Sequence, residues 1–82
     1  MRIETALKQA QNILRNKNFV SANLDCEILM SKALDKDRKY IILNPKKKLE
    51  NHKLAYFNSL VKERSYGKPI AYLTEKKYFW DS

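Results

Sequence analysis

At 82 residues the chain fits one domain with a small core, because a domain of this size buries only about 60–65% of the surface of its unfolded chain. Its hydrophobic content of 44% excludes disorder throughout despite a formal net charge of +8. The single cysteine, Cys26, excludes an intrachain disulfide, and the sequence shows neither a secretory signal nor a transmembrane run. We therefore expect a soluble cytoplasmic domain, with an organellar matrix as the other possible compartment.

The positive charge is spread along the whole chain. Lysines and arginines occur in every segment with acidic residues between them, and only Lys46–Lys48 forms a block. Clustered basic residues favour nucleic acid, whereas dispersed ones are at least as compatible with an acidic protein partner. We expect a monomer without a nucleic-acid or membrane partner.

The first predicted helix runs from about Ile3 to Lys17. Its apolar residues recur at spacings of three and four, which is typical of one helix face: Ile3, Ala6, Leu7, Ala10, Ile13 and Leu14. Glu4 and Lys8 form a favourable pair one turn apart. The polar residues 16–18 then end the pattern.

A second helix is predicted up to Leu34, with Ser21 or Asn23 as the residue that caps it by accepting a backbone N–H bond. Apolar residues cover most of its circumference: Ala22, Leu24, Cys26, Ile28, Leu29, Met30, Ala33 and Leu34. A helix with so little solvent-facing surface is expected to be the central one.

The third predicted helix is short. Asp35 or Asp37 can cap it, and Asn44 with Pro45 ends it. Its expected apolar face consists of Tyr40, Ile41 and Leu43. The lysine block that follows is expected to be a solvated connection.

The fourth predicted helix runs from about Asn51 to Tyr66, with an inward face formed by Leu54, Phe57, Leu60 and Val61. Gly67 is the only glycine, and it falls where a helix needs a left-handed C-terminal residue. Pro69 then suits the start of a short fifth helix that extends to Leu73. The sequence thus predicts an all-α bundle of about five helices.

An extended segment is predicted after the bundle, because the aromatic residues of Lys77–Trp80 favour a strand. No second strand is available to pair with it, so we expect the chain to be frayed beyond Glu75. An unpaired strand of this kind indicates the front part of a longer protein.

Groups for catalysis are scarce in this sequence. His52 is the only histidine, and it is expected to be exposed in the first turn of the fourth helix. Cys26 is interpreted as a buried small hydrophobe, and no glycine-rich loop is present. We therefore assign no catalytic, cofactor-binding or metal-binding residue and expect these 82 residues alone to catalyse nothing.

Two further sets of residues are of interest: a pair of opposite charges, and a group of aromatic residues that are candidates for contact with a partner or another domain together with Arg64. Asp25 and Arg64 lie beside apolar faces and carry opposite charges, so they either tie the second helix to the fourth or are each solvated at a helix edge. The second set is aromatic and either packs on a neighbouring domain or touches a bound partner. It consists of Tyr72, Tyr78, Phe79 and Trp80.

Two segments of the sequence give a resemblance to a known family. The segment from Ser21 to Leu34 has an aspartate followed by a small residue and paired aliphatics, and the segment from Leu49 to Trp80 has a helix, then arginine, glycine and proline, then a short apolar helix and an aromatic strand. The matching residues of the specific final block are Arg64, Gly67, Pro69, Ile70, Ala71, Tyr72, Leu73, Thr74, Phe79 and Trp80. In these features the chain resembles the N-terminal domain of the release factor glutamine methyltransferases, the HemK/PrmC family.

Two positions depart from the family pattern. Glu75 stands where the family usually has a glycine after the threonine, so the turn that leads into the hairpin is expected to differ in conformation. Glu50 replaces the serine or threonine that caps the fourth helix, and the cap is expected to shift to Asn51.

The resemblance implies a helical release-factor-docking domain over residues 1–74 and the start of a linker hairpin over residues 75–82. It also implies a Rossmann-like catalytic domain beyond this chain, which uses S-adenosylmethionine to methylate the glutamine of the Gly-Gly-Gln motif in peptide-chain release factors. The expected partners are the release factor and the protein's own catalytic domain, with Arg64 and the aromatic residues as contact candidates. The alternative is a free-standing basic helical adaptor that binds RNA or the ribosome.

Overall fold

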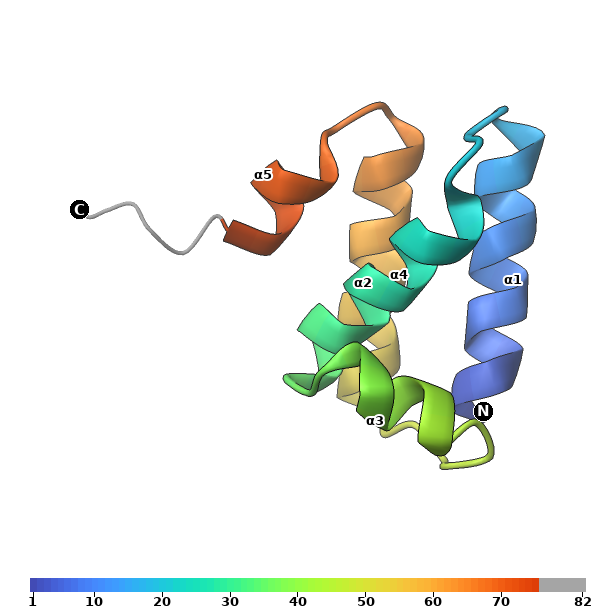
Figure 1. The fold of residues 1–82 in the computed structure, drawn as a ribbon, viewed down its shortest axis with the longest axis vertical. Coiled ribbons are helices and arrows are strands. Elements are labelled where there is room, and N and C mark those ends of the chain that lie inside the picture. Colours follow the sequence, from blue (N-terminus) through green and yellow to red (C-terminus); the bar gives the residue numbers. More distant parts are fainter. Residues whose placement is uncertain (76–82) are drawn as a thin grey trace.

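The computed structural model describes residues 1–75, which form an all-α bundle. In chain order the helices are α1 (Ile3–Asn16), α2 (Ala22–Leu34), α3 (Arg38–Leu43), α4 (Asn51–Ser65) and α5 (Ile70–Glu75). Figure 1 shows α1 and α4 running in the same direction with α2 between them in the opposite direction, α3 at the end where the chain begins, and α5 beside the far end of α4. The fold predicted from the sequence is confirmed.

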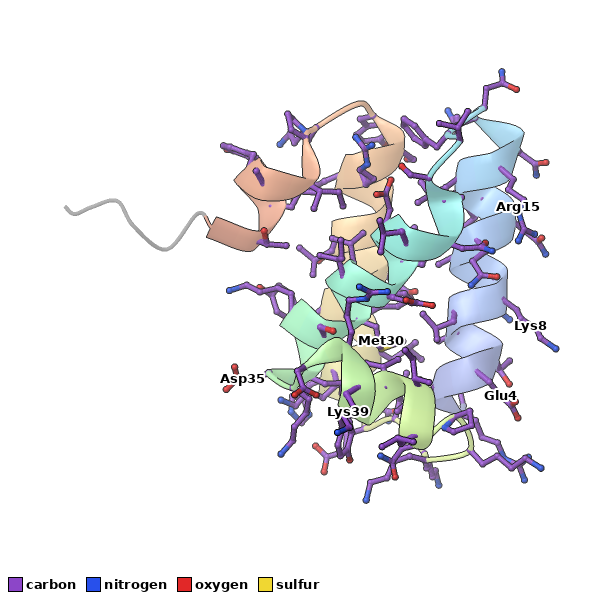
Figure 2. The ribbon with its side chains drawn as sticks, viewed as in Figure 1. Glu4, Lys8, Arg15, Met30, Asp35 and Lys39 are labelled. Atoms are coloured by element: carbon purple, nitrogen blue, oxygen red, sulfur yellow. The ribbon has the colours of Figure 1, made fainter. Side chains whose placement is uncertain are left out.

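Helix α1 buries one narrow stripe of side chains against the bundle. The stripe consists of Ile3, Ala6, Ala10 and Leu14. Ile13 is 47% exposed, so its predicted place on the inner face is wrong: a residue adjacent to Leu14 is rotated about 100° away from it around the helix. Glu4 forms its ion pair with Arg2 at 3.9 Å, rather than the predicted one with Lys8. Figure 2 shows Lys8 and Arg15 along the outer side of α1, whereas Met30 of α2 lies in the middle of the bundle.

Helices α1, α2 and α4 end with the same pair of backbone hydrogen bonds, known as the Schellman motif. In each, the residue at the reversal is left-handed, with φ of 68° at Asn18, 56° at Asp35 and 101° at Gly67. The two bonds after α4 run from Gly67 N–H to the Arg64 carbonyl at 2.9 Å and from Lys68 N–H to the Glu63 carbonyl at 3.4 Å. The predicted role of Gly67 is confirmed.

Helix α2 is the central helix, as predicted, because it packs against α1, α3, α4 and α5. Its start differs from the prediction in one detail. Ser21 occupies the capping position, but its side chain makes no capping bond, and Asn23 lies inside the helix. Asn23 instead accepts a hydrogen bond from the Arg15 guanidinium at 2.7 Å, which joins the helix to the end of α1.

Helix α3 begins at a true side-chain cap, because Asp37 accepts a bond from the Tyr40 N–H at 2.9 Å. Ile41 is buried, but Leu43 is 67% exposed, so the predicted inward position of Leu43 is wrong. Leu43 is the last residue of α3, where the helical spacing ends. The predicted shift of the α4 cap is also wrong. Glu50 keeps the capping position without a side-chain bond, and α4 begins at Asn51.

The loop between α3 and α4 is held against the start of α1 by backbone hydrogen bonds. Glu4 N–H donates to the Pro45 carbonyl at 2.8 Å, Ile3 N–H to the Lys47 carbonyl at 2.9 Å, and Leu49 N–H to the Met1 carbonyl at 2.8 Å. The first two bonds satisfy N–H groups that a helix start leaves without intrahelical partners, and α1 has no side-chain cap. The lysine block is therefore fixed in place although its side chains are exposed.

Helix α5 begins at Ile70, one residue after the Pro69 predicted to open it, and continues to Glu75. It packs against α2 and α4 and contributes Leu73, which is 1% exposed, to the core. Among residues 1–75, no helix has the length and apolar character needed to cross a membrane. The predicted strand at Lys77–Trp80 and the predicted fraying beyond Glu75 lie outside the described residues.

Candidate functional site

Asp25 is the charged side chain most deeply buried among the described residues. It lies in the first turn of α2 and is only 4% exposed. Its Oδ2 atom accepts a hydrogen bond from the Ser21 hydroxyl at 3.1 Å and another from Arg64 Nε at 3.1 Å. A buried carboxylate needs such partners, because an unpaired charge in a core is strongly disfavoured.

Arg64 reaches Asp25 from the last turn of α4 and makes two further contacts. Its Nη1 donates to the Lys68 carbonyl at 3.0 Å, in the connection that leads to α5. Its guanidinium carbon lies 4.5 Å from the centre of the Phe19 ring, in the connection between α1 and α2. One side chain thus joins two helices and two loops. Of the two interpretations left open by the sequence, the structure shows the tie between α2 and α4.

This arrangement bears on Arg64 as a contact candidate. The side chain is 17% exposed, and its Nε and Nη1 donors already bind groups of the bundle. Through these contacts Arg64 holds the end of α4 in place. Its predicted contact with another domain or a partner stays a prediction. Sequence reasoning missed the contacts of Phe19 and Ser21 with this pair. The contact of Ser21 could have been expected, because residues four positions apart at a helix start lie on the same side.

The aromatic candidate that the structure describes lies on the surface. Tyr72 of α5 is 57% exposed, and the Lys68 ammonium lies 5.6 Å from the centre of its ring. A side-chain hydrogen bond with Glu63, at 3.1 Å, raises the pKa of Lys68. Tyr72 is therefore available for contact. Tyr78, Phe79 and Trp80 lie outside the described residues.

A further exposed apolar surface, which sequence reasoning missed, lies where α1 turns into α2. Val20 is fully exposed and Leu24 is 43% exposed, and both line a shallow hollow of about 540 Å³ together with Phe19. Residue Leu24 was predicted as part of the apolar circumference of α2, but its side of the helix faces solvent. Exposed apolar side chains at a turn are not recognised from the spacing of apolar residues, because that spacing identifies only the buried face of a helix.

The described residues offer little for covalent chemistry. Burial raises the pKa of the Cys26 thiol to about 12, with the neighbouring Asp25 charge as a smaller cause, so the thiol stays protonated and unreactive. His52 is exposed, as predicted, with its Nε2 3.5 Å from the Glu50 carboxylate. Within residues 1–75 no three histidine, cysteine or acidic side chains come together as a metal site.

Comparison with known proteins finds a family whose model matches this chain. The family model described as PrmC N-terminal domain matches residues 5–74 of the chain. A protein of Aliivibrio fischeri named release factor glutamine methyltransferase is 35% identical over 78 residues, which is 95% of this chain and 28% of the relative. No solved structure matches the chain at comparable significance.

Two other bacterial proteins with the same name are similar over nearly the whole chain. The one from Leptospira interrogans is 35% identical and the one from Buchnera aphidicola subsp. Baizongia pistaciae is 42% identical, each over 80 residues. These alignments cover 98% of this chain and 28% of each relative. The chain thus spans a little over a quarter of the length of the curated relatives that it matches.

Proposed function

The chain belongs to the PrmC N-terminal domain family, and on this basis we propose that it is the substrate-docking domain of a protein methyltransferase. The parent enzyme transfers a methyl group from S-adenosylmethionine to the N5 atom of a glutamine side chain. Its substrate is the glutamine of the Gly-Gly-Gln motif in peptide-chain release factors. The domain helps to hold the release factor, and catalysis belongs to the rest of the parent enzyme.

One observation carries this proposal: the family match extends over residues 5–74, and relatives named release factor glutamine methyltransferase align with almost the entire chain. The relatives are more than three times as long as the aligned segment. An N-terminal domain that precedes a larger catalytic part is the simplest account of these lengths. Residues 1–74 are then the docking domain, and residues 75–82 begin the connection to the catalytic domain.

A rigid helical domain can assist methyl transfer without touching the reacting amide. Contacts made far from the reacting atoms provide binding energy that positions a substrate for reaction. The contacts of Arg64 with Asp25 and the Lys68 carbonyl fix α4 relative to α2 and to the chain that leads into α5. The exposed α5 surface, which carries Tyr72, is thereby held in a fixed position on the bundle.

The residues described here do not fit an S-adenosylmethionine site. The cofactor carries a sulfonium cation, whereas the pocket near α3 is lined by Lys36, Lys47, Lys48 and Lys53, whose charges would repel it. Gly67, the only glycine of the chain, ends α4 and does not belong to a phosphate- or nucleotide-type turn after a strand. We assign the cofactor to the remainder of the parent enzyme and no step of the reaction to this chain.

The test is an amide-shift titration of the isotope-labelled chain with the Gly-Gly-Gln-bearing domain of a release factor from the same organism, with an RNA hairpin as the control. We expect localised shifts with the release factor and none with RNA. Shifts with RNA alone would favour the free-standing adaptor instead. Silence with both would contradict the docking role and leave support of the catalytic domain as the function.

A second test examines the parent enzyme rather than the isolated chain. Methylation of the release factor by the full-length protein is compared with that by a protein lacking residues 1–74. Loss of methylation on the intact factor, together with retained methylation of a short Gly-Gly-Gln peptide, is the expected result. Equal loss on both substrates would contradict docking and indicate that the catalytic part no longer folds.

A further inference from the structure

A pocket of about 240 Å³ opens where the start of α1, the end of α2, α3 and the start of α4 meet. Four lysines surround it: Lys36, Lys47, Lys48 and Lys53. Glu50 is the one acidic residue among its lining residues, and its carboxylate lies 3.5 Å from His52 Nε2. We call this feature the lysine pocket. The docking role proposed above does not make use of it.

The inside of the lysine pocket is apolar. Among its lining residues, Ile3 and Leu49 are almost fully buried, and Leu34 and Tyr40 are half-buried. The Lys36 ammonium lies 5.3 Å from the centre of the Tyr40 ring, which holds a positive charge over one wall. The volume is below the roughly 300–1,000 Å³ of typical small-molecule sites. The space suits one apolar side chain rather than a whole small ligand.

The four positive charges around the pocket outnumber the single negative charge of Glu50. None of the four lysine ammonium groups has an ion-pair partner among the side chains that the structure describes, whereas Arg38, Arg64 and Lys68 each have one. Lysines held close together repel one another, and carboxylates from a partner would relieve that repulsion. The positive rim therefore favours an acidic partner.

The backbone that carries two of these lysines is fixed before any partner arrives. Hydrogen bonds from Ile3 N–H to the Lys47 carbonyl and from Leu49 N–H to the Met1 carbonyl hold both sides of Lys48 against the start of α1. An isolated β-bridge between Arg2 and Lys48 marks the same contact. A preorganised backbone lowers the entropic cost of binding.

We propose that the lysine pocket binds an acidic peptide segment, with one apolar side chain of the segment inside the pocket and its carboxylates on the lysine rim. A nucleic-acid backbone fits less well, because phosphates follow a continuous basic groove and do not enter an apolar hollow. The proposal goes beyond the docking function and does not depend on methylation. It would hold for an acidic segment of any protein partner.

The test uses the 82-residue chain and a fluorescein-labelled peptide in which one phenylalanine lies between two runs of three glutamates, measured by anisotropy at low salt. A second peptide replaces the phenylalanine with serine. A charge-reversal variant of the pocket, Lys47→Glu with Lys53→Glu, is matched by Lys8→Glu with Lys62→Glu, which makes the same change of charge at exposed positions outside the pocket. Circular dichroism verifies that both variants remain helical.

We expect the pocket variant to weaken binding of the phenylalanine peptide by about tenfold or more, and the matched variant by no more than about threefold. The serine peptide should bind at least about fivefold more weakly than the phenylalanine peptide, because it leaves the pocket unfilled. Equal losses in the two variants, or equal affinities of the two peptides, would overturn the proposal. So would tighter binding of a twelve-nucleotide oligouridylate that depends on Lys47 and Lys53.

A failure here is distinguishable from a failure of the docking function. The peptide assay contains neither release factor nor methyl donor, so its outcome leaves the methylation and titration tests unaffected. Conversely, a release factor that binds elsewhere on the bundle would support docking while the lysine pocket stays free. An amide-shift titration of the isotope-labelled chain with the phenylalanine peptide should shift the signals of Leu34, Tyr40 and Leu49. These shifts would locate the occupied surface independently of the charge variants.

Discussion

Arg64 Nε lies 3.1 Å from Asp25 Oδ2 although 39 positions separate the two residues in the chain. The pair joins the last turn of α4 to the first turn of α2, and both side chains are largely shielded from water at 17% and 6% exposure. Removing one partner of such a pair leaves a charge without compensation in the interior. The pair is therefore a point where a single substitution should affect the whole bundle.

The first prediction concerns this pair. Arg64→Ala should lower the free energy of unfolding by about 2–4 kcal/mol, because the buried Asp25 side chain would lose its main partner. Each kcal/mol corresponds to a fall of about 4–8 °C in Tm for a domain of this size. Thermal and urea denaturation measure the effect. Adding Asp25→Ala to Arg64→Ala should cost less than the two single changes together, because the residues are coupled.

The matched control is Arg38→Ala. Its Nη2 atom lies 2.8 Å from Glu27 Oε1, but the Arg38 side chain is 49% exposed. An exposed pair contributes only about 0–1 kcal/mol, so this variant should unfold nearly like the unmodified chain. Equal destabilisation by Arg64→Ala and Arg38→Ala would show that burial does not increase the contribution of the Asp25–Arg64 pair to stability.

The second prediction concerns the left-handed residues at the helix ends. Gly67→Ala should destabilise the chain by about 1–2 kcal/mol because φ is 101° there, a region that side chains with a Cβ atom disfavour. Space is not the cause, since nothing lies within 4 Å of a Cβ at this position. Asp35→Gly, at φ of 56°, should have no such cost and should raise Tm. Urea midpoints of the two variants provide the comparison.

The third prediction concerns thiol reactivity. Burial, followed by the Asp25 charge, raises the pKa of Cys26 from 9.0 to about 12, so the folded chain holds about a thousandfold less thiolate than the unfolded one at pH 8. Iodoacetamide should therefore modify Cys26 only as fast as the chain unfolds. Mass spectrometry with and without urea measures the two rates. Rapid modification without urea would contradict the burial of this side chain.

The same shift gives a dependence of stability on pH. Between about pH 9 and pH 12 the unfolded chain loses the Cys26 proton while the folded chain keeps it, so the unfolded state binds fewer protons. The contribution of Cys26 to stability is thus present below pH 9 and is lost as the pH rises toward 12. Cys26→Ala should show a shallower loss of stability over pH 9–10.5 than the unmodified chain. An identical slope would contradict this assignment.

The fourth prediction separates contact from stability on α5. Tyr72→Ala should change the free energy of unfolding by less than about 0.5 kcal/mol, because more than half of the residue is exposed. The adjacent Leu73→Ala should cost about 2–5 kcal/mol, because Leu73 is 1% exposed and belongs to the core. If Tyr72 contacts a partner or the catalytic domain, Tyr72→Ala should weaken methylation of the release factor by the parent enzyme. Unchanged methylation would remove Tyr72 from the contact candidates.

The fifth prediction concerns affinity. If the proposed docking function holds, the isolated chain should bind a release factor with Kd weaker than about 1 μM, because that proposal assigns the contact with the reactive glutamine to the rest of the parent enzyme. Isothermal titration calorimetry measures it directly. A submicromolar Kd would show instead that this domain alone provides most of the recognition.

Much of the helical arrangement was predictable from local sequence. The apolar spacing in α1 and α4, the cap at Asp37 and the reversal at Gly67 each depend on residues within a few positions of one another. The errors at Ile13 and Leu43 have different causes. Ile13 is apolar but lies beside the buried stripe of α1, and a pattern does not give the width of the surface that a neighbouring helix covers. Leu43 is the last residue of the short helix α3, where the helical spacing ends.

The contacts that form the candidate site join residues far apart in the chain, so they could not be derived from local sequence spacing. The Asp25–Arg64 pair was one of two open interpretations, because opposite charges on two helices meet only if the helices pack in the right register. The position of Phe19 under the Arg64 guanidinium and the bond from Arg64 to the Lys68 carbonyl had no local signal at all. The lysine block was predicted as a solvated connection, and its backbone contacts with Met1 and Ile3 became visible only in three dimensions.

The bond between Leu49 N–H and the Met1 carbonyl has a practical consequence for anyone who produces this protein. The first residue is part of the structure, and a purification tag fused in front of it would emerge beside Lys48 and the rim of the lysine pocket. An acidic epitope tag would bring carboxylates to that rim at high effective concentration and compete with any partner. Binding assays on this domain therefore require an N-terminus from which the tag has been cleaved.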